Sequence, residues 1–306
     1  MESDSTVSSE SKNVKMTCRQ VFEERIKKFN KEMKSDMILS DQLDYRDPQN
    51  LSEYAQEIYE NMKSEEVMWM VDPEYLQKVQ TEIKDTSRAF LIEWIIDVHR
   101  KFRLVPEALY VTQHIIDQFM SKKKIQKNQL HLLGVATLLI AAKYEEIYPP
   151  ELRDFLAVSE NKFTKKNVLD MEREILLTLN FRLTAPSSYR FLQRYRRISP
   201  AINDDEVFFY AQYLQEISLL DATLLKFKPS QIAAASVILS AKQLKKINCW
   251  NNDMVKYTGY KEEDLTETIE EVKCFALEIN PKFISTLKYK FSKPEYLNVA
   301  KHEFKF

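Results

Sequence analysis

Glycine is almost absent from this 306-residue chain, which contains only Gly134 and Gly259, whereas average usage would give about twenty. Loops that cradle phosphate groups need glycine where the backbone approaches the ligand closely. A Walker loop, a Rossmann turn and a glycine-rich kinase loop are therefore all excluded. Hairpin-rich β folds also rely on glycine at positive φ. The scarcity predicts an all-α protein without a nucleotide-binding loop.

Cysteine is also scarce, and long apolar runs and an excess of either charge are missing. Cys18, Cys249 and Cys274 are too few and too far apart for a zinc site or a disulfide framework, which fits a reducing intracellular location, in the nucleus or the cytoplasm. No apolar stretch approaches the ~18 residues of a membrane span, and the amino terminus has no signal-peptide core. A net charge of −1 favours neither nucleic acid nor acidic lipid. We therefore expect no membrane or nucleic-acid partner, no metal and no cofactor.

The chain contains a repeat of about a hundred residues. LLGVATLLIAAK, which ends at Lys143, resembles QIAAASVILSAK, which ends at Lys242. EALYVTQHI, from Glu107, resembles EVFFYAQYL, from Glu206. Both pairs are 99 residues apart. One offset shared by two separate segments predicts two similar helical domains.

The domain boundaries follow from this repeat. We expect a polar, flexible N-terminal segment at 1–50, an N-terminal helix and the first domain at 51–184, and the second domain with a C-terminal tail at 185–306. Hydrophobic periodicity predicts helices of the first domain at roughly 87–102, 106–120, 128–143, 150–157 and 164–179. In both domains the third helix is apolar on every face, which is typical of the central helix of a bundle.

Two charges stand in unusual places near the end of the first domain. On a helical wheel, Glu172 is the only charge in an apolar arc that runs from Val168 to Leu179. This pattern fits a glutamate that is paired inside the fold, and it also fits one that awaits a binding partner. Lys143 ends the apolar helix, and a favourable interaction with the helix dipole would by itself account for it.

The helix that starts near Ser87 combines an inward charge with outward aromatic residues. Arg88 lies on the apolar side, and a buried arginine needs an internal acid. Phe90 and Trp94 lie among polar residues, where burial does not explain them. Neighbouring exposed aromatics flanked by carboxylates predict a peptide-docking patch.

Four segments resemble successive helices of a cyclin box of the A/B mitotic type: SRAFLIEWIIDVHRKFRL, EALYVTQHIIDQFM, LLIAAKYEEIYPPE and NVLDMEREILLTLNFRL. The similarity extends from about Leu51 to KYKFSKPEYLNVA near the carboxyl end. Cyclins are non-catalytic regulatory subunits of protein kinases. The resemblance therefore implies two tandem five-helix cyclin repeats, a preceding N-terminal helix and no enzymatic activity of the chain itself.

The resemblance also implies a surface that binds and activates a cyclin-dependent kinase. Lys143 and Glu172 would hold the PSTAIRE-type helix of the kinase, so that the kinase glutamate pairs with the strand lysine that orients the ATP phosphates. The same surface would include Tyr144, Glu145, Glu146, Leu176, Phe181, Leu183, Tyr54 and Ile58. Lys242 is the matched position in the second repeat and should not contribute.

A second surface implied by the resemblance is a substrate-docking patch, together with the buried ion pair Arg88–Asp117 beneath it. The patch would consist of Phe90, Leu91, Trp94, Asp97 and His131. It would bind substrates or inhibitors with Arg-x-Leu-type motifs. The segment begins Ser-Arg-Ala-Phe-Leu at Ser87, where the family usually has Met-Arg-Ala-Ile-Leu, so we expect weaker docking.

Two other interpretations stay open at this point. A cyclin-fold transcription-associated protein would use the same fold to bind nucleic acid or peptides, although the near-neutral charge and the lack of a zinc ribbon count against nucleic acid. A helical metal-dependent enzyme would need a magnesium site of the DDxxD type. Its best candidate, Asp204-Asp205, is followed by Phe208 where a carboxylate is required. Copurification of a protein kinase separates the first interpretation from these two.

Overall fold

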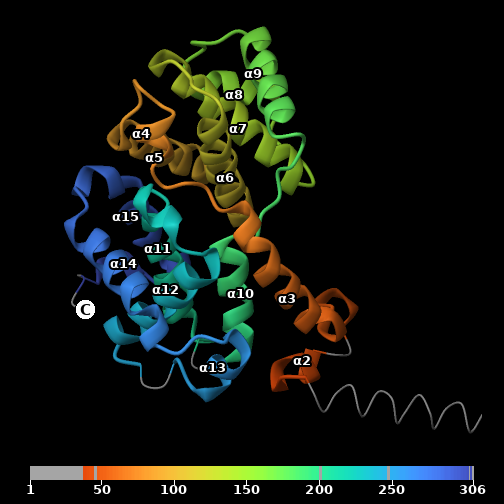
Figure 1. Cartoon of the computed structure of the whole chain (residues 1–306), viewed down its shortest axis with the longest axis vertical. Coiled ribbons are helices and arrows are strands. Elements are labelled where there is room, and N and C mark those ends of the chain that lie inside the picture. Colours follow the sequence, from red (N-terminus) through yellow and green to blue (C-terminus); the bar gives the residue numbers. More distant parts are fainter. Residues whose placement is uncertain (1–36, 45–46, 200–201, 247–248, 303, 305–306) are drawn as a thin grey trace, which may run out of the picture. The chain divides into compact units, whose positions relative to one another are not determined.

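The computed structural model describes residues 37–44, 47–199, 202–246, 249–302 and 304, and all regular elements in this part of the chain are helical (Figure 1). The prediction of an all-α fold is confirmed. The chain divides into two compact units, with the boundary between Gln56 and Glu57. Most of the predicted segment 1–50 lies outside the described residues.

The described part of the first unit is short. It contains α2 (Leu39–Asp44), followed by 3-10 turns at Pro48–Asn50 and Ser52–Tyr54. Helix α3 (Ala55–Glu65) begins at the unit boundary, where we expected the N-terminal helix. Within the second unit the ring of Tyr59 packs against Phe191, so α3 is joined to the core by an aromatic contact.

The first repeat has the five predicted helices. They are α5 (Asp85–Phe102), α6 (Pro106–Lys122), α7 (Leu130–Glu145), α8 (Leu152–Val158) and α9 (Lys165–Thr178). Helix α7 is buried from Leu133 to Ala142 on all its faces, which confirms it as the central helix of this group. A short helix, α4 (Tyr75–Lys78), precedes the repeat.

The second repeat follows the same scheme. Its helices are α10 (Ser188–Ile198), α11 (Asp205–Ser218), α12 (Pro229–Gln243), α13 (Asn252–Thr258) and α14 (Thr266–Glu278), and α15 (Ser285–Phe291) comes after them. Helices α6 and α11 begin 99 residues apart, at Pro106 and Asp205, and so do α7 and α12, at Leu130 and Pro229. The repeat predicted from the sequence is therefore present in the fold.

Both glycines occupy positions where another residue would be strained. A Cβ atom on Gly134 would lie 2.6 Å from Cδ1 of Leu91, because α5 and α7 approach closely there. Gly259 ends α13 with φ of 74°, in the left-handed region that residues with a Cβ rarely adopt. Glycine at position 134 therefore allows α5 and α7 to pack closely, and glycine at position 259 allows the backbone conformation that ends α13.

Each repeat contains one deeply buried ion pair. In the first, Arg88 donates two hydrogen bonds to Asp117 on α6, at 2.7 and 2.6 Å, and Tyr75 donates a third at 2.7 Å. In the second, Lys290 on α15 donates to both carboxylate oxygens of Glu216 on α11, at 2.6 and 2.8 Å. Such charges are tolerated in a core only because each is paired and hydrogen-bonded.

Several polar contacts within the second unit join the two repeats, and three of them involve Arg88, Glu107 and Glu66. Arg88 donates to the backbone oxygen of Leu219 at 2.8 Å. Glu107 of α6 pairs with Arg190 of α10 at 3.1 Å. The buried carboxylate of Glu66 accepts hydrogen bonds from the backbone N–H and the hydroxyl of Ser230 at the start of α12. The repeats are therefore held together by polar contacts as well as by packing.

Candidate functional site

Lys143 and Glu172 pair with each other. The Lys143 Nζ atom at the end of α7 lies 2.7 Å from Oε1 of Glu172 on α9. Only 13% of the Glu172 side chain is exposed, whereas 47% of the Lys143 side chain is exposed. Of the two alternatives that the sequence left open for Glu172, the structure shows the internal pair. The lysine ammonium still faces solvent, so the pair stays accessible to a partner.

Exposed apolar side chains follow Lys143 closely in the sequence. Tyr144 is half-exposed, and its hydroxyl shares a hydrogen bond with that of Thr184, which follows α9. Ile147 and Tyr148 are 87% and 91% exposed, since the chain leaves the helix after Glu145 and continues to Pro149. The sequence analysis did not select these two residues, although the Pro-Pro stop after them already indicated that they lie beyond the helix. Tyrosine and isoleucine side chains at such exposure are candidates for a protein contact when they cluster.

The predicted apolar residues of α9 and the following turn are exposed to different degrees. Phe181 is exposed and has a positive φ of 58°, whereas Leu176 and Leu183 are half-buried. Leu177, which the sequence analysis did not select, is exposed as well. Tyr54, in the first unit, and Ile58, in the second, are each about half-exposed.

Glu145 and Glu146 have internal contacts. Glu146 accepts a hydrogen bond of 2.5 Å from the backbone N–H of Val105, at the start of α6. Glu145 lies 4.0 Å from Arg190, and burial raises the pKa of its carboxyl group. Both residues therefore connect the end of α7 to other helices, which the sequence could not indicate.

The predicted docking patch is aromatic, and it is extended by Phe283, which is distant in the sequence. The exposed ring of Phe90 lies against Phe283, with ring centroids 4.5 Å apart. Trp94 and His131 meet edge to face at 4.4 Å. Leu91 was expected in the patch, but it is buried against Gly134 because α5 and α7 pack closely there. Leu91 therefore supports the patch from beneath.

The acidic edge of the patch is already engaged. Glu93 accepts hydrogen bonds from the hydroxyl groups of Ser285 and Thr286, at 3.2 and 2.7 Å. Asp97 pairs with Arg100 and Lys101, each at 2.7 Å. An incoming arginine would have to share these carboxylates with groups of the chain itself.

The carboxylates proposed for a magnesium site have other contacts. Asp204 accepts from the backbone N–H of Glu206 at the start of α11 and pairs with Lys246 at 2.8 Å, and Asp205 pairs with Arg196. The described ranges hold no group of three residues that could ligate a metal ion. Within the same ranges, no helix combines the length and the apolar character that a bilayer crossing requires.

Family comparisons assign both repeats. The family model "Cyclin, N-terminal domain" matches residues 57–184, and "Cyclin, C-terminal domain" matches residues 186–305. Among solved structures, a viral cyclin from herpesvirus saimiri has a TM-score of 0.62 at 21% identity, over 72% of this chain and 96% of that chain. A chain of the yeast RNA Pol II CTD kinase CTDK-1 complex has a TM-score of 0.56 at 13% identity, over 68% of this chain and 74% of that chain. At these identities the structural likeness supports the fold alone.

Sequence relatives are cyclins of the A and B types. The chain is 34% identical to a G2/mitotic-specific cyclin-B of Spisula solidissima over 258 residues, which cover 84% of this chain and 59% of the relative. It is 39% identical to Cyclin-A1-4 of Oryza sativa subsp. japonica over 209 residues, which cover 67% and 59%. The G2/mitotic-specific cyclin S13-7 of Glycine max is 36% identical, with coverage of 67% and 79%. The chain thus spans about three fifths of the first two relatives, and with both repeats matched it belongs to the cyclin family, A/B type.

Proposed function

We propose that this chain is a non-catalytic regulatory subunit that binds and activates a cyclin-dependent Ser/Thr protein kinase in cell-division control. The observation that carries this proposal is the accessible Lys143–Glu172 pair, with Tyr144, Ile147 and Tyr148 exposed within five residues of Lys143 along the chain. We expect the complex in the nucleus, the cytoplasm or both.

The chemistry of the pair suits a helix of the kinase. The Lys143 ammonium has three N–H donors, of which Glu172 uses one, and the second carboxylate oxygen of Glu172 remains an acceptor. The pair can therefore donate to one group of a partner and accept from another. The surrounding apolar side chains exclude water when the partner covers them, which strengthens both hydrogen bonds.

Activation follows if the docked kinase helix is held in its inward position. There its glutamate pairs with the strand lysine that orients the ATP phosphates. A regulatory subunit that binds this arrangement more tightly than the inactive one shifts the population by the difference in affinity.

The patch of Phe90, Trp94 and His131 gives the complex a second role, the recruitment of substrates or inhibitors with Arg-x-Leu-type motifs. Aromatic side chains beside Asp97 suit a peptide that presents a leucine and an arginine. Docking should be weak, because internal groups already engage the acidic edge.

The experiment is affinity purification of the chain from cells, followed by a kinase assay on the purified complex. We expect a cyclin-dependent kinase to copurify and the isolated chain to show no phosphotransferase activity. Tyr148→Ala should weaken kinase binding by roughly thirtyfold without a change in thermal stability. Gln243→Ala, just past Lys242 in the second repeat, is the control. Capture of a transcription complex without any kinase would favour the transcription-associated alternative.

A further inference from the structure

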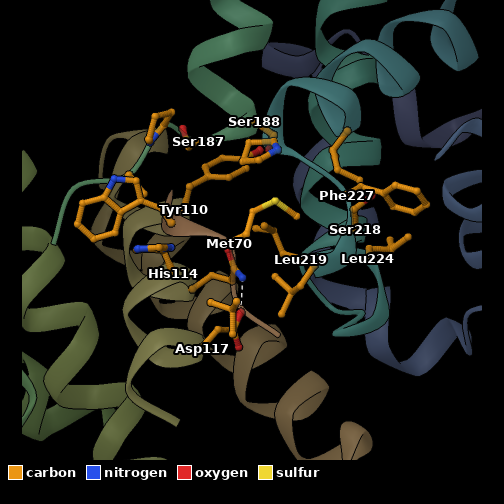
Figure 2. A pocket seen from close by; sticks show the side chains of 18 of the residues that line it. Met70, Tyr110, His114, Asp117, Ser187, Ser188, Ser218, Leu219, Leu224 and Phe227 are labelled. Atoms are coloured by element: carbon orange, nitrogen blue, oxygen red, sulfur yellow. Dashed lines mark hydrogen bonds between the residues drawn. The ribbon is translucent and has the colours of Figure 1, made fainter. Parts of the chain in front are cut away.

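A cavity of about 120 Å³ lies between the two repeats, and none of the residues predicted for the kinase-binding surface or the docking patch lines it. Helix α6 contributes Tyr110 and His114 from the first repeat, and the second repeat contributes Leu219 and Leu224. Figure 2 shows the side chain of Met70 between these two groups. The cavity is part of the joint between the repeats, so a ligand there would contact both of them.

The acidic side chains around the cavity already have partners. Asp117 is saturated by Arg88, Tyr75 and Gln113. The Glu66 carboxylate accepts from two donors of Ser230, and Asp221, the third acid, accepts from Thr223. Most of the remaining lining residues are apolar. A charged ligand would lose its hydration without gaining a counter-charge, and this favours a neutral one.

Two polar groups at the cavity still have hydrogen-bonding capacity. Nε2 of His114 is buried and has no hydrogen-bond partner among the described residues. Burial lowers the pKa of this histidine to about 4, so the ring is neutral and can form one more bond. The Tyr110 hydroxyl donates to Oε1 of Gln215 at 3.3 Å, which leaves its oxygen free to accept. A ligand with one polar atom would satisfy the histidine.

The volume limits the size of the ligand. An apolar cavity of about 150 Å³ holds one benzene molecule, so a ring fits here only if a lining side chain yields. Met70 is suited to this, because its side chain is unbranched and adapts to the space available. We propose that the cavity binds a neutral small molecule with one aromatic ring and one hydrogen-bonding atom, of the phenol or indole class, between the two repeats. This site is independent of the proposed kinase-binding surface.

The binding test uses the purified full chain with phenol, indole, toluene and benzylammonium, followed by ligand-observed NMR and thermal unfolding. We expect dissociation constants of about 0.1–1 mM for phenol and indole, as is typical for ligands of this size. At ten times that concentration the melting temperature should rise by roughly 3–5 °C. Benzylammonium should bind at least about tenfold more weakly, since its charge finds no free partner.

Paired substitutions locate the binding. Met70→Trp fills the cavity and should abolish binding, whereas Met68→Trp, on an exposed side chain two residues away, should not. His114→Phe should remove the preference for phenol over toluene. His131→Phe is its control, because His131 also has a buried Nε2 without a partner among the described residues but does not line the cavity. If Met70→Trp fails to fold, Leu225→Trp at the half-buried edge of the cavity replaces it.

Four results would overturn the proposal. Three of them are the absence of saturable binding, equal binding by the Met70→Trp variant, and equal binding of benzylammonium. Binding of a tryptophan-bearing peptide without any binding of free indole would also overturn it, in favour of a protein ligand. None of these results depends on a kinase, so the proposed function is tested separately.

Discussion

The two repeats end their central helices with the same ion pair but in different surroundings. Lys242 pairs with Glu262 at 2.6 Å, much as Lys143 pairs with Glu172, yet both members of the second pair are about half-exposed. In the first repeat, exposed Tyr144, Ile147 and Tyr148 lie close by in sequence. Among the described residues between Phe181 and Leu277, no large apolar side chain is exposed. The difference indicates that an ion pair at a helix end is a general feature of the repeat, and it supports the proposal that only the first of the two, with its exposed apolar neighbours, is a docking site.

The buried ion pairs show a second difference between the repeats. Asp117 and Glu216 are 99 residues apart, so both repeats place a buried carboxylate at the same position. The first repeat neutralises it with Arg88 from its own first helix. The second uses Lys290 from α15, beyond the five-helix scheme. The C-terminal helix is therefore a structural part of the second repeat.

Removal of the cation from either buried ion pair should have the largest effect on the stability of the fold. Arg88→Ala and Lys290→Ala each leave a buried carboxylate without its cation, which should lower the free energy of unfolding by about 3–5 kcal/mol. Arg88→Ala should cost more of the two, because it also removes the bond to Leu219 across the joint. Urea denaturation followed by circular dichroism measures both. Lys78→Ala, at an exposed ion pair, should change little, and a comparably small effect of Lys290→Ala would show that α15 is dispensable.

The second largest effect is expected at the ion pairs that end the two central helices, α7 and α12. Lys143→Ala or Glu172→Ala should weaken kinase binding by about 2–5 kcal/mol, or roughly thirty- to several-thousand-fold, because one charge is left buried under the partner. Helicity and melting should stay nearly normal, since the Lys143 side chain is half-exposed in the free chain. Lys242→Ala should bind and activate normally. Titration calorimetry with the purified kinase gives the affinities.

All three variants could instead have a lower melting temperature while their folded fraction still activates the kinase. That result would show that Lys143 and Glu172 stabilise the fold and do not bind the kinase.

A lower pH should reduce the free energy of unfolding mainly through the first repeat, which contains the buried His99 and His114. Burial lowers their pKa values to about 3 and about 4, whereas the unfolded value is near 6.5. Both are thus neutral in the fold. The stability they contribute is fully present above about pH 6.5 and is lost as the pH falls toward 4, at about 1.4 kcal/mol per pH unit for each histidine.

Urea unfolding of the wild type and of His114→Phe at pH 7, 6 and 5 tests this. The wild type should lose more stability per pH unit than the variant. Equal pH profiles would mean that His114 is already charged in the folded protein.

The smallest effect concerns the first helix of each repeat. The three aromatic residues of α10 are all buried, whereas α5 exposes Phe90 and leaves Trp94 half-buried. Trp94→Ala should therefore slow phosphorylation of motif-bearing substrates by about tenfold, or about 1.4 kcal/mol, and spare motif-less ones. Gln193→Ala on α10 should affect neither class. Ser87→Met should strengthen docking if the patch is used, and equal slowing of both classes by Trp94→Ala would exclude it.

The sequence determined the helices, the repeat and which faces are buried. The 3.6-residue period fixes the burial of a helix face locally, so the inward position of Arg88 and the fully buried α7 could be predicted. The 99-residue offset could be read without any structure. For the same reason Glu172 could be recognised as unusual, but its partner could not be derived from its own helix.

Only the tertiary structure decided which distant groups meet. Lys143 of α7 pairs with Glu172 of α9. Glu93 accepts hydrogen bonds from hydroxyl groups of a segment almost two hundred residues away in the sequence. Lys290 pairs with the buried Glu216 carboxylate on α11. Leu91 differs from its neighbour Phe90 for the same reason, since a glycine on another helix leaves space for it. Periodicity describes one helix at a time, whereas these contacts depend on how helices from separate parts of the chain pack together.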